Sequence, residues 1–335
     1  MKTSNYLMLA LLALGLSGAA CNKSPAVKVE HTAMPTGPVD LRLKWPLHQH
    51  ALQSFDMKLT LNMTVPGLPQ PMKEDMAMGQ DMALTVTREL DGGKREVEME
   101  YLKMKVSASM AGKQMMEFDS SKKAAKDADP ATAAIRKLVG AKIQFILDAS
   151  NRVESVQGVE ALQGRLREIL KGDQSGTLKS LMGPDALKQM VDHAASLPAK
   201  PVKPGDSWPV QREYPLGQLG TLVLDFTNTL TGWEKLHDRW CAKIGVEGTI
   251  KSKATDPADA EVNGMSIKVS DGTCSGETWF DIDLGMFVES TLNNDLKMAI
   301  TVPASRPGAK KTDAPQTQTI SGDMHQTVEF KFSLQ

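Results

Sequence analysis

The C-terminal stretch "ISGDMHQTVEFKFSL" (residues 320–334) alternates apolar and polar side chains along most of its length. The apolar residues fall on even positions, and they are Ile320, Met324, Val328, Phe330, Phe332 and Leu334. Successive side chains of an extended strand point to opposite faces of a sheet. This pattern therefore predicts a strand with one face on a core and the other in water, as is common in antiparallel sheets.

The same alternation occurs near the start of the chain. Between residues 72 and 86 the apolar side chains again occupy even positions, namely Met72, Met76, Met78, Met82, Leu84 and Val86. The stretch "LDGGKRE" (residues 90–96) then predicts a hairpin turn. Beyond this turn the apolar phase shifts by one residue near Tyr101, which predicts a β-bulge there.

Helical signals interrupt the strands. In "DADPATAAIRKLVG" (residues 127–140), Asp129 is a predicted N-cap, Pro130 a first helical residue and Gly140 the end. Apolar residues then recur at helical spacing within residues 158–200. Strand alternation returns beyond residue 220, with a hairpin predicted at "DIDLGMF" (residues 281–287). We therefore expect a β-rich α+β fold, with curved antiparallel sheet or sheets of long hairpins and a central helical cluster packed against them.

The chain divides into five predicted segments. Residues 1–20 form a signal peptide, 21–39 a flexible tether, 40–157 an N-terminal antiparallel β region, 158–200 a helical segment and 201–335 a C-terminal antiparallel β region. The tether prediction depends on the prolines and charges of residues 22–39, a composition that cannot bury a core. The proline-rich stretch "SLPAKPVKPGDSWP" (residues 196–209) joins the two β regions. Whether these regions form one sheet or two is open at this point.

The N-terminus has the layout of a secretory signal peptide. Lys2 precedes an apolar run over residues 6–16, which is too short to span a bilayer, and small residues follow it. The run leads directly to Cys21 and so resembles the lipobox of bacterial lipoproteins, although Gly18 stands where leucine is usual. The resemblance implies that Cys21 is lipidated and that Asn22 directs the protein to the outer membrane. The alternative is a secreted protein with a free or paired Cys21.

Two further cysteines, Cys241 and Cys274, complete the three of the chain. In an oxidising compartment we expect them to form a disulfide, and two unpaired thiols are the alternative. The chain has 39 basic and 40 acidic residues. That balance, without a basic stripe, argues against nucleic acid as a partner.

The chain is rich in methionine, with 20 residues, four of them in "MKEDMAMGQDM" (residues 72–82). Thioethers can bind Cu(I), but methionine is also a flexible core filler, and the shared parity of these residues favours the core. An apolar surface that contacts lipid or peptide is a third interpretation. His48 and His50 could chelate a metal from one face of a strand, but we expect surface histidines and predict no metal site or cofactor. Similarly, Asp281 begins a calcium-like "DIDLG" that we interpret as a hairpin turn.

Sequence motifs for catalysis are absent. Neither Ser120 beside Asp119 nor Ser275 near Glu277 lies in a G-x-S-x-G elbow, and no phosphate loop or dinucleotide fingerprint occurs. We therefore predict no catalytic residue and no enzymatic activity. A hydrolase whose triad assembles from distant residues is the alternative.

Four stretches together resemble a family of uncharacterised bacterial secreted proteins and lipoproteins, known as a domain of unknown function. They are "MMEFDSSK" (115–122), "LVGAKIQFILDASNRVESVQG" (138–158), "LPAKPVKPGDSW" (197–208) and "SGETWFDIDLGMF" (275–287). The resemblance covers most of residues 50–335. Its motifs are turn and strand signatures, so it supports the fold and the compartment and implies no functional residue.

These observations lead to an expected function. We expect a lipid-anchored protein of the bacterial cell envelope, bound to the membrane through its N-terminal lipid. Its expected role is a binding or structural module with an apolar concave surface for a hydrophobic ligand or protein partner. Periplasmic lipoprotein carriers use curved sheets in this way, which is an analogy of fold alone. A methionine-based copper-binding protein and a hydrolase are the alternatives.

Overall fold

All the strands of the structure belong to one antiparallel sheet. The computed structural model describes residues 33–123, 130–167, 187–188, 192–215, 221–236, 238–253, 266–303 and 317–334. Its strands are β1 (His50–Thr64), β2 (Met72–Leu90), β3 (Lys94–Met110), β4 (Lys113–Asp119), β5 (Lys142–Leu147), β6 (Val153–Gln157), β7 (Ser207–Pro215), β8 (Thr221–Leu236), β9 (Arg239–Ser252), β10 (Ser266–Asp281), β11 (Met286–Pro303) and β12 (Thr317–Leu334). Their order is β6-β5-β3-β2-β1-β12-β11-β10-β9-β8-β7, and β4 pairs with β3.

The two β regions meet where β1 pairs with β12. The pairing is antiparallel and continuous, from Ala51 opposite Leu334 to Thr64 opposite Ser321. On either side of this junction the chain proceeds mainly by hairpins to an edge, β6 on the N-terminal side and β7 on the C-terminal side. The two regions are therefore halves of one sheet.

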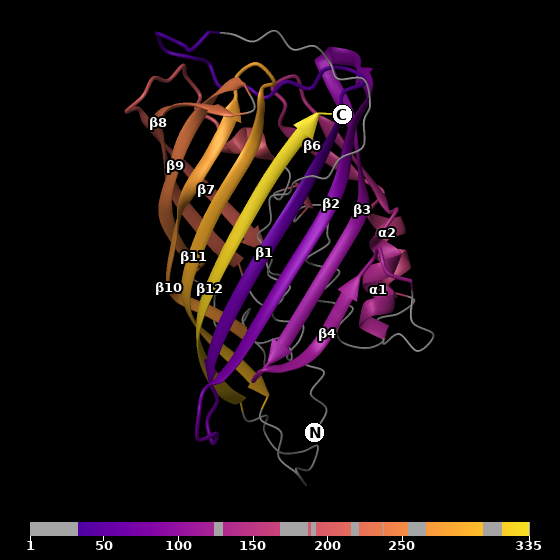
Figure 1. Cartoon of the computed structure of the whole chain (residues 1–335), viewed down its shortest axis with the longest axis vertical. Helices are drawn as coiled ribbons and strands as arrows, with labels where there is room; N and C mark the ends of the chain where they lie inside the picture. Colours follow the sequence, from indigo (N-terminus) through magenta and orange to yellow (C-terminus); the bar gives the residue numbers. More distant parts are fainter. Residues whose placement is uncertain are drawn as a thin grey trace.

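The sheet is strongly curved. In Figure 1, β1, β2 and β12 cross the front of the molecule, while the strands toward β7 turn away behind them. Glycines on the inner side of the curved sheet let the side chains and backbone of neighbouring strands come close to them. A Cβ atom on Gly248 would meet the Asp225 carbonyl oxygen and the Phe226 ring, and one on Gly276 would meet the backbone of β11. Only glycine fits at such positions without displacing the neighbouring strand.

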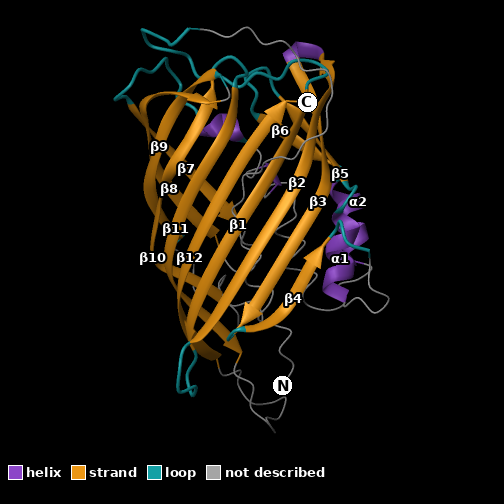
Figure 2. Ribbon diagram, in the orientation of Figure 1, coloured by secondary structure: helices purple, strands orange, loops and turns teal. Residues whose placement is uncertain are grey.

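Short helices lie at one side of the sheet, and this corrects the predicted fold class. The described α-helices are α1 (Pro130–Leu138) and α2 (Val159–Arg167), which lie beside β3 to β5 (Figure 2). The described part of residues 158–200 holds α2, a helical pair at 187–188 and the 3-10 turn η4 (His193–Ser196), but no central helical cluster. The α+β prediction was therefore wrong, and the fold is nearly all β. Residues 168–186 and 189–191 of the predicted helical segment lie outside the described residues.

Several local predictions are confirmed. Helix α1 begins at Pro130 and ends shortly before Gly140, whose φ of 75° terminates it; Asp129 lies outside the described residues. The hairpin turn is η3 (Asp91–Gly93), with positive φ at both glycines. The bulge near Tyr101 appears as a register shift, because Asp81 pairs with Lys103 but Met82 pairs with Tyr101.

The segment before β1 ties the two halves together at one end of the sheet. Val39 forms an isolated bridge with Val202. The Asn151 side-chain amide donates to the Leu43 carbonyl at 2.9 Å, and the next residue, Lys44, donates from its backbone to Gly285 at 3.0 Å. One short stretch thus contacts both the β5–β6 turn and the β10–β11 turn.

Candidate functional site

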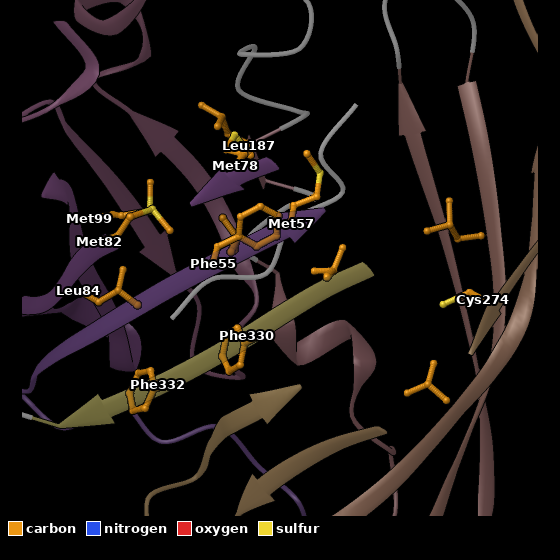
Figure 3. Packing of buried hydrophobic residues seen from close by; sticks show 14 of the residues in the cluster. Phe55, Met57, Met78, Met82, Leu84, Met99, Leu187, Cys274, Phe330 and Phe332 are labelled. Atoms are coloured by element: carbon orange, nitrogen blue, oxygen red, sulfur yellow. The ribbon is translucent and has the colours of Figure 1, made fainter. Parts of the chain in front are cut away.

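The candidate site is the concave face of the sheet, defined as the buried side of its strands. Alternation places the same parity of each strand on this side, so that Phe55 and Met57 of β1 lie beside Phe330 of β12 and Met78 of β2 (Figure 3). The opposite parity is polar and exposed, as at Asp56 and Lys58. The buried apolar residues of the concave face form one continuous cluster across both halves.

Methionine is the characteristic residue of the N-terminal half of the concave face. Seven methionines of β1 to β3 are buried there, namely Met57, Met63, Met76, Met78, Met82, Met99 and, beyond the β3 bulge, Met104. Leu187 packs into the same cluster (Figure 3). This confirms the prediction that the "MKEDMAMGQDM" methionines face the core. Unbranched thioether side chains adapt their shape more easily than leucine or isoleucine.

A buried polar pair lies between β11 and β12 on the concave face. The Asn294 side chain donates to the Gln326 Oε1 at 2.8 Å, and the Gln326 Nε2 donates to the sulfur of Met57 at 3.0 Å. Gln326 is 1% exposed. Both polar groups of the Gln326 side chain have a partner, which is the usual condition for burial of an amide.

A segment around η4 connects the two edges of the sheet across the concave face. Arg152, next to edge strand β6, forms a two-point ion pair with Asp192, from Nε to Oδ2 at 2.9 Å and from a terminal nitrogen to Oδ2 at 2.8 Å. Arg212 of the opposite edge strand β7 donates to the Asp192 carbonyl at 2.6 Å and to the Ser196 hydroxyl at 2.7 Å. The Ser196 carbonyl accepts from Trp208 of β7 at 2.9 Å. We call residues 192–196 the strap.

The strap places a histidine against the aromatic residues of the concave face. The His193 ring lies 6.3 Å from Phe330 and 6.4 Å from Phe287, measured between ring centroids. Burial lowers the pKa of His193 to about 3, and the charge of Arg212 adds to the effect. His193 is therefore neutral at ordinary pH, so it acts here as an aromatic surface. The strap residues from His193 to Ser196 remain partly exposed.

Three buried polar side-chain atoms have no hydrogen-bond partner among the described residues. They are the indole nitrogen of Trp45, Oε1 of Gln49 and Oε1 of Glu74. Trp45 and Gln49 lie just before β1, whereas Glu74 lies on the concave face of β2, toward the opposite end of the sheet. Burial raises the pKa of Glu74. Such groups are rare in native proteins and call for a physical explanation.

Comparison with known families identifies the chain at the level of family. The model of a protein family of unknown function, DUF6263, matches residues 92–287, which is more than half of the sequence. The chain belongs to this family. The DUF6263 assignment agrees with the resemblance to an uncharacterised domain, and it assigns no activity. No curated protein matches the sequence.

Solved structures resemble this DUF6263 protein only weakly. A structure titled for lipid–protein interactions in lipovitellin is 7% identical, with a TM-score of 0.41 over 87% of this chain. The DUF6263 chain spans 26% of the lipovitellin chain. Pseudomonas aeruginosa OccK5 (OpdH) is 6% identical, with a TM-score of 0.23, and the match covers 87% of this chain and 100% of the OccK5 chain. A DUF1329 family protein from Desulfovibrio piger is 8% identical, with a TM-score of 0.17 over 85% of this chain and 84% of its own.

The predicted disulfide is not formed in the structure. Cys241 and Cys274 are free and buried. Cys241 pairs with Asp281 across β9 and β10, whereas Cys274 pairs with Gly248, so the two positions lie seven residues apart along β10. At about 3.3 Å per residue the separation is roughly 20 Å, far beyond the ~6 Å between the Cα atoms of a disulfide. Burial raises the pKa of each thiol to about 12.

The other residues considered from the sequence do not come together as a site. His48 is exposed in a turn, and His50 of β1 hydrogen-bonds Thr85 at 2.7 Å. The Ser120 hydroxyl accepts from the Met104 backbone at 3.0 Å, and Asp281 caps the β10–β11 turn through the backbone of Leu284 at 2.9 Å. No group of three or more His, Cys, Asp or Glu side chains in the described ranges could hold a metal ion. Cys21 lies outside the described residues.

The polar residues most prominent in the structure were not predicted from the sequence. Glu74 occupies an even position between Met72 and Met76, so its place on the apolar face was visible in the strand parity. Asp192 and Arg152 gave no such signal, because their pairing joins segments 40 residues apart.

Among the helices that the structure describes, none has the length and apolar composition of a membrane-spanning segment.

Proposed function

We propose that this DUF6263 protein is a lipid-anchored, non-enzymatic binding module of the bacterial cell envelope, and that its concave face binds an apolar ligand such as an acyl chain. The observation that carries the proposal is the concave face itself. It is apolar across both halves of a twelve-stranded sheet, and it holds the carboxyl group of Glu74, whose buried Oε1 atom has no hydrogen-bond partner among the described residues. A sheet face that served only as a core would not be expected to retain such a group.

The methionines support a binding role. Met57, Met76 and Met78 occupy neighbouring strands at the centre of the N-terminal half. Surfaces that accommodate apolar partners of varying shape are often rich in methionine, because the unbranched thioether chain changes rotamer at little cost. The strap residues Ala194 to Ser196 are partly exposed to solvent.

The polarity of the outer side agrees with this role. Charged residues such as Lys58, Lys103 and Glu98 occupy it, and many form ion pairs, for example Lys142 with Glu98 at 2.7 Å. These exposed pairs contribute little stability, but they keep the outer side in water. An apolar ligand would therefore be held on the concave face alone.

The sequence supports the anchor. The predicted signal peptide over residues 1–20 leads directly to Cys21, which favours attachment of acyl chains to that cysteine, and each buried methylene adds about 0.8 kcal/mol of membrane affinity. Residues 21–39 would then join the sheet to the membrane surface, up to the bridge between Val39 and Val202. An apolar carrier or receptor benefits from such a position, because its ligand is insoluble in water.

Photocrosslinking tests the ligand-binding proposal without altering the protein. The mature protein would be incubated with a diazirine-bearing fatty acid, irradiated, and mapped by peptide mass spectrometry. We expect adducts on concave residues such as Met57 and Met78, and none on the outer residues of the same strands, Lys58 and Ala77. Adducts on the outer residues, or native mass spectra of membrane-purified protein without co-purified lipid, would count against the proposal.

The anchor has a separate test. Intact-mass analysis of the membrane fraction should show a chain that begins at an acylated Cys21. The Cys21→Ser variant should leave the membrane fraction, while a Cys274→Ser variant, which alters a buried thiol, should remain in it. A wild-type protein that keeps residues 1–20 unmodified would overturn this part of the proposal.

A further inference from the structure

Glu74 is a carboxylic acid in an apolar wall. It lies on β2 with the same parity as Met76 and Met78, and it is 2% exposed. Its Oε1 atom has no hydrogen-bond partner in the part of the chain that the structure describes. An isolated charge in apolar surroundings is strongly unfavourable, so the carboxyl group needs either a proton or a cationic partner.

The neighbours of Glu74 on the concave face cannot serve as partners. Register places Leu61 of β1 on one side and Met110 of β3 on the other. Along β2, the residues on the same face are Met72 and Met76. All four side chains lack an N–H or O–H donor. Within the sheet, the carboxyl group is therefore flanked by aliphatic and thioether groups.

The adjacent cation is engaged elsewhere. Lys73 has the opposite parity, and its ammonium group pairs with Asp75 at 2.8 Å. Asp75 also accepts a hydrogen bond from Thr60 at 2.7 Å, on the outer side of the sheet. The nearest basic residue in sequence thus faces away from Glu74, and a cationic partner for Glu74 would come from outside this part of the fold.

We infer that Glu74 binds the ammonium group of an amphiphile whose hydrocarbon chain lies along the methionines of the concave face. The inference rests on the proposed function and specifies its ligand as a cationic, primary-amine amphiphile. An ammonium group supplies both the missing charge and the missing donor, whereas an anionic head group would be repelled. A neutral hydroxyl head group would form only the weaker, uncharged kind of hydrogen bond.

Three probes with the same chain length separate the head group from the chain. Dodecylamine, dodecanol and dodecanoate would be titrated into the full-length mature protein, and their dissociation constants measured by calorimetry. We expect dodecylamine to bind about tenfold more tightly than dodecanol, with dodecanoate weakest. The isosteric Glu74→Gln variant should bind dodecanol as the wild type does and lose the preference for the amine.

A matched control and a stability measurement complete the test. Glu98→Gln removes a carboxylate from the outer side of neighbouring β3 and should leave all three affinities unchanged. Without ligand, Glu74→Leu should melt at a higher temperature than the wild type, because it removes an unpaired buried carboxyl group. A lower melting temperature for both Glu74→Leu and Glu74→Gln would show a structural role and overturn the inference.

The outcomes distinguish this inference from the proposed function. Equal amine preference in the wild type and in Glu74→Gln would overturn the role of Glu74, and binding of dodecanol by both would still support an apolar binding module. Failure of the wild type to bind any of the three probes would overturn both. Retained dodecanol binding with loss of amine preference only in Glu74→Gln would establish the assignment.

Discussion

Replacement of Asp192 by alanine tests whether the strap holds the two edges of the sheet together. The Asp192 carboxylate is 8% exposed, and it accepts the two-point ion pair from Arg152 beside β6. The backbone carbonyl of the same residue accepts from Arg212 of β7. Asp192→Ala therefore removes the link to one edge and leaves the link to the other.

The expected effect follows from the exposure of the two partners. Hydrogen bonds to charged groups contribute about 1.5–3 kcal/mol, and loss of one partner of a fully buried pair costs about 3–5 kcal/mol. Arg152 is 52% exposed, so water solvates its guanidinium group once the carboxylate is gone. We therefore expect a loss of about 2 kcal/mol in the free energy of unfolding, within the first range and below the second.

Urea denaturation followed by circular dichroism measures this loss. The unfolding midpoint should fall while the slope of the free energy with urea stays constant. Glu154→Gln is the matched control, because it weakens a neighbouring ion pair in which Lys94 is 40% exposed and Glu154 47% exposed. The loss in the free energy of unfolding for this control should stay below about 0.5 kcal/mol. If Asp192→Ala destabilises the protein no more than Glu154→Gln does, the strap does not hold the edges.

Three further predictions concern the core and the thiols. Phe55→Ala, at a fully buried position between β2 and β12, should lower the free energy of unfolding by about 3–5 kcal/mol in the same assay. Gly248→Ala should destabilise by about 1–3 kcal/mol, because its Cβ would meet the Asp225 carbonyl and the Phe226 ring; Gly164→Ala, in open space on α2, should not lower stability and serves as the control. Native protein should not react with Ellman's reagent, because both thiols are buried. Protein that is denatured without reductant should show two reactive thiols, provided that Cys21 is lipidated or mutated and does not add a third. A count of zero thiols in the denatured protein would show that Cys241 and Cys274 form a disulfide.

The strands could be predicted from the sequence because the alternation of apolar and polar residues within each strand distinguishes its buried face from its exposed face. The even-numbered apolar positions of β2 and β12 needed no knowledge of their partners. The turn at residues 91–93 and the bulge near Tyr101 were equally local, since glycine pairs and a change of parity mark them. The join of the two halves was not predictable in this way, because β1 and β12 pair across almost the whole length of the chain.

The errors also have local and non-local causes. Helical spacing within residues 158–200 led to a predicted helical cluster, but the strap owes its course to Arg152, Arg212 and Trp208, which lie outside that interval. The disulfide prediction counted cysteines and did not consider parity. Cys241 has the opposite parity to Ala242 and Ile244, whose side chains are buried on the concave face, whereas Cys274 shares the buried parity of β10. Two cysteines on opposite faces of adjacent strands cannot be bridged.

The contrast between Gln326 and Glu74 bears on the candidate site. Both flank β1 on the concave face, Gln326 opposite Leu59 and Glu74 opposite Leu61, and they are 1% and 2% exposed. Gln326 has two partners within the fold, Asn294 and the sulfur of Met57. If buried polar groups on this wall were simply tolerated, the two residues should be equally lacking in partners. The described residues give both polar groups of the Gln326 amide a partner and leave Oε1 of Glu74 without one. The ammonium ligand that we propose for Glu74 would supply the missing partner.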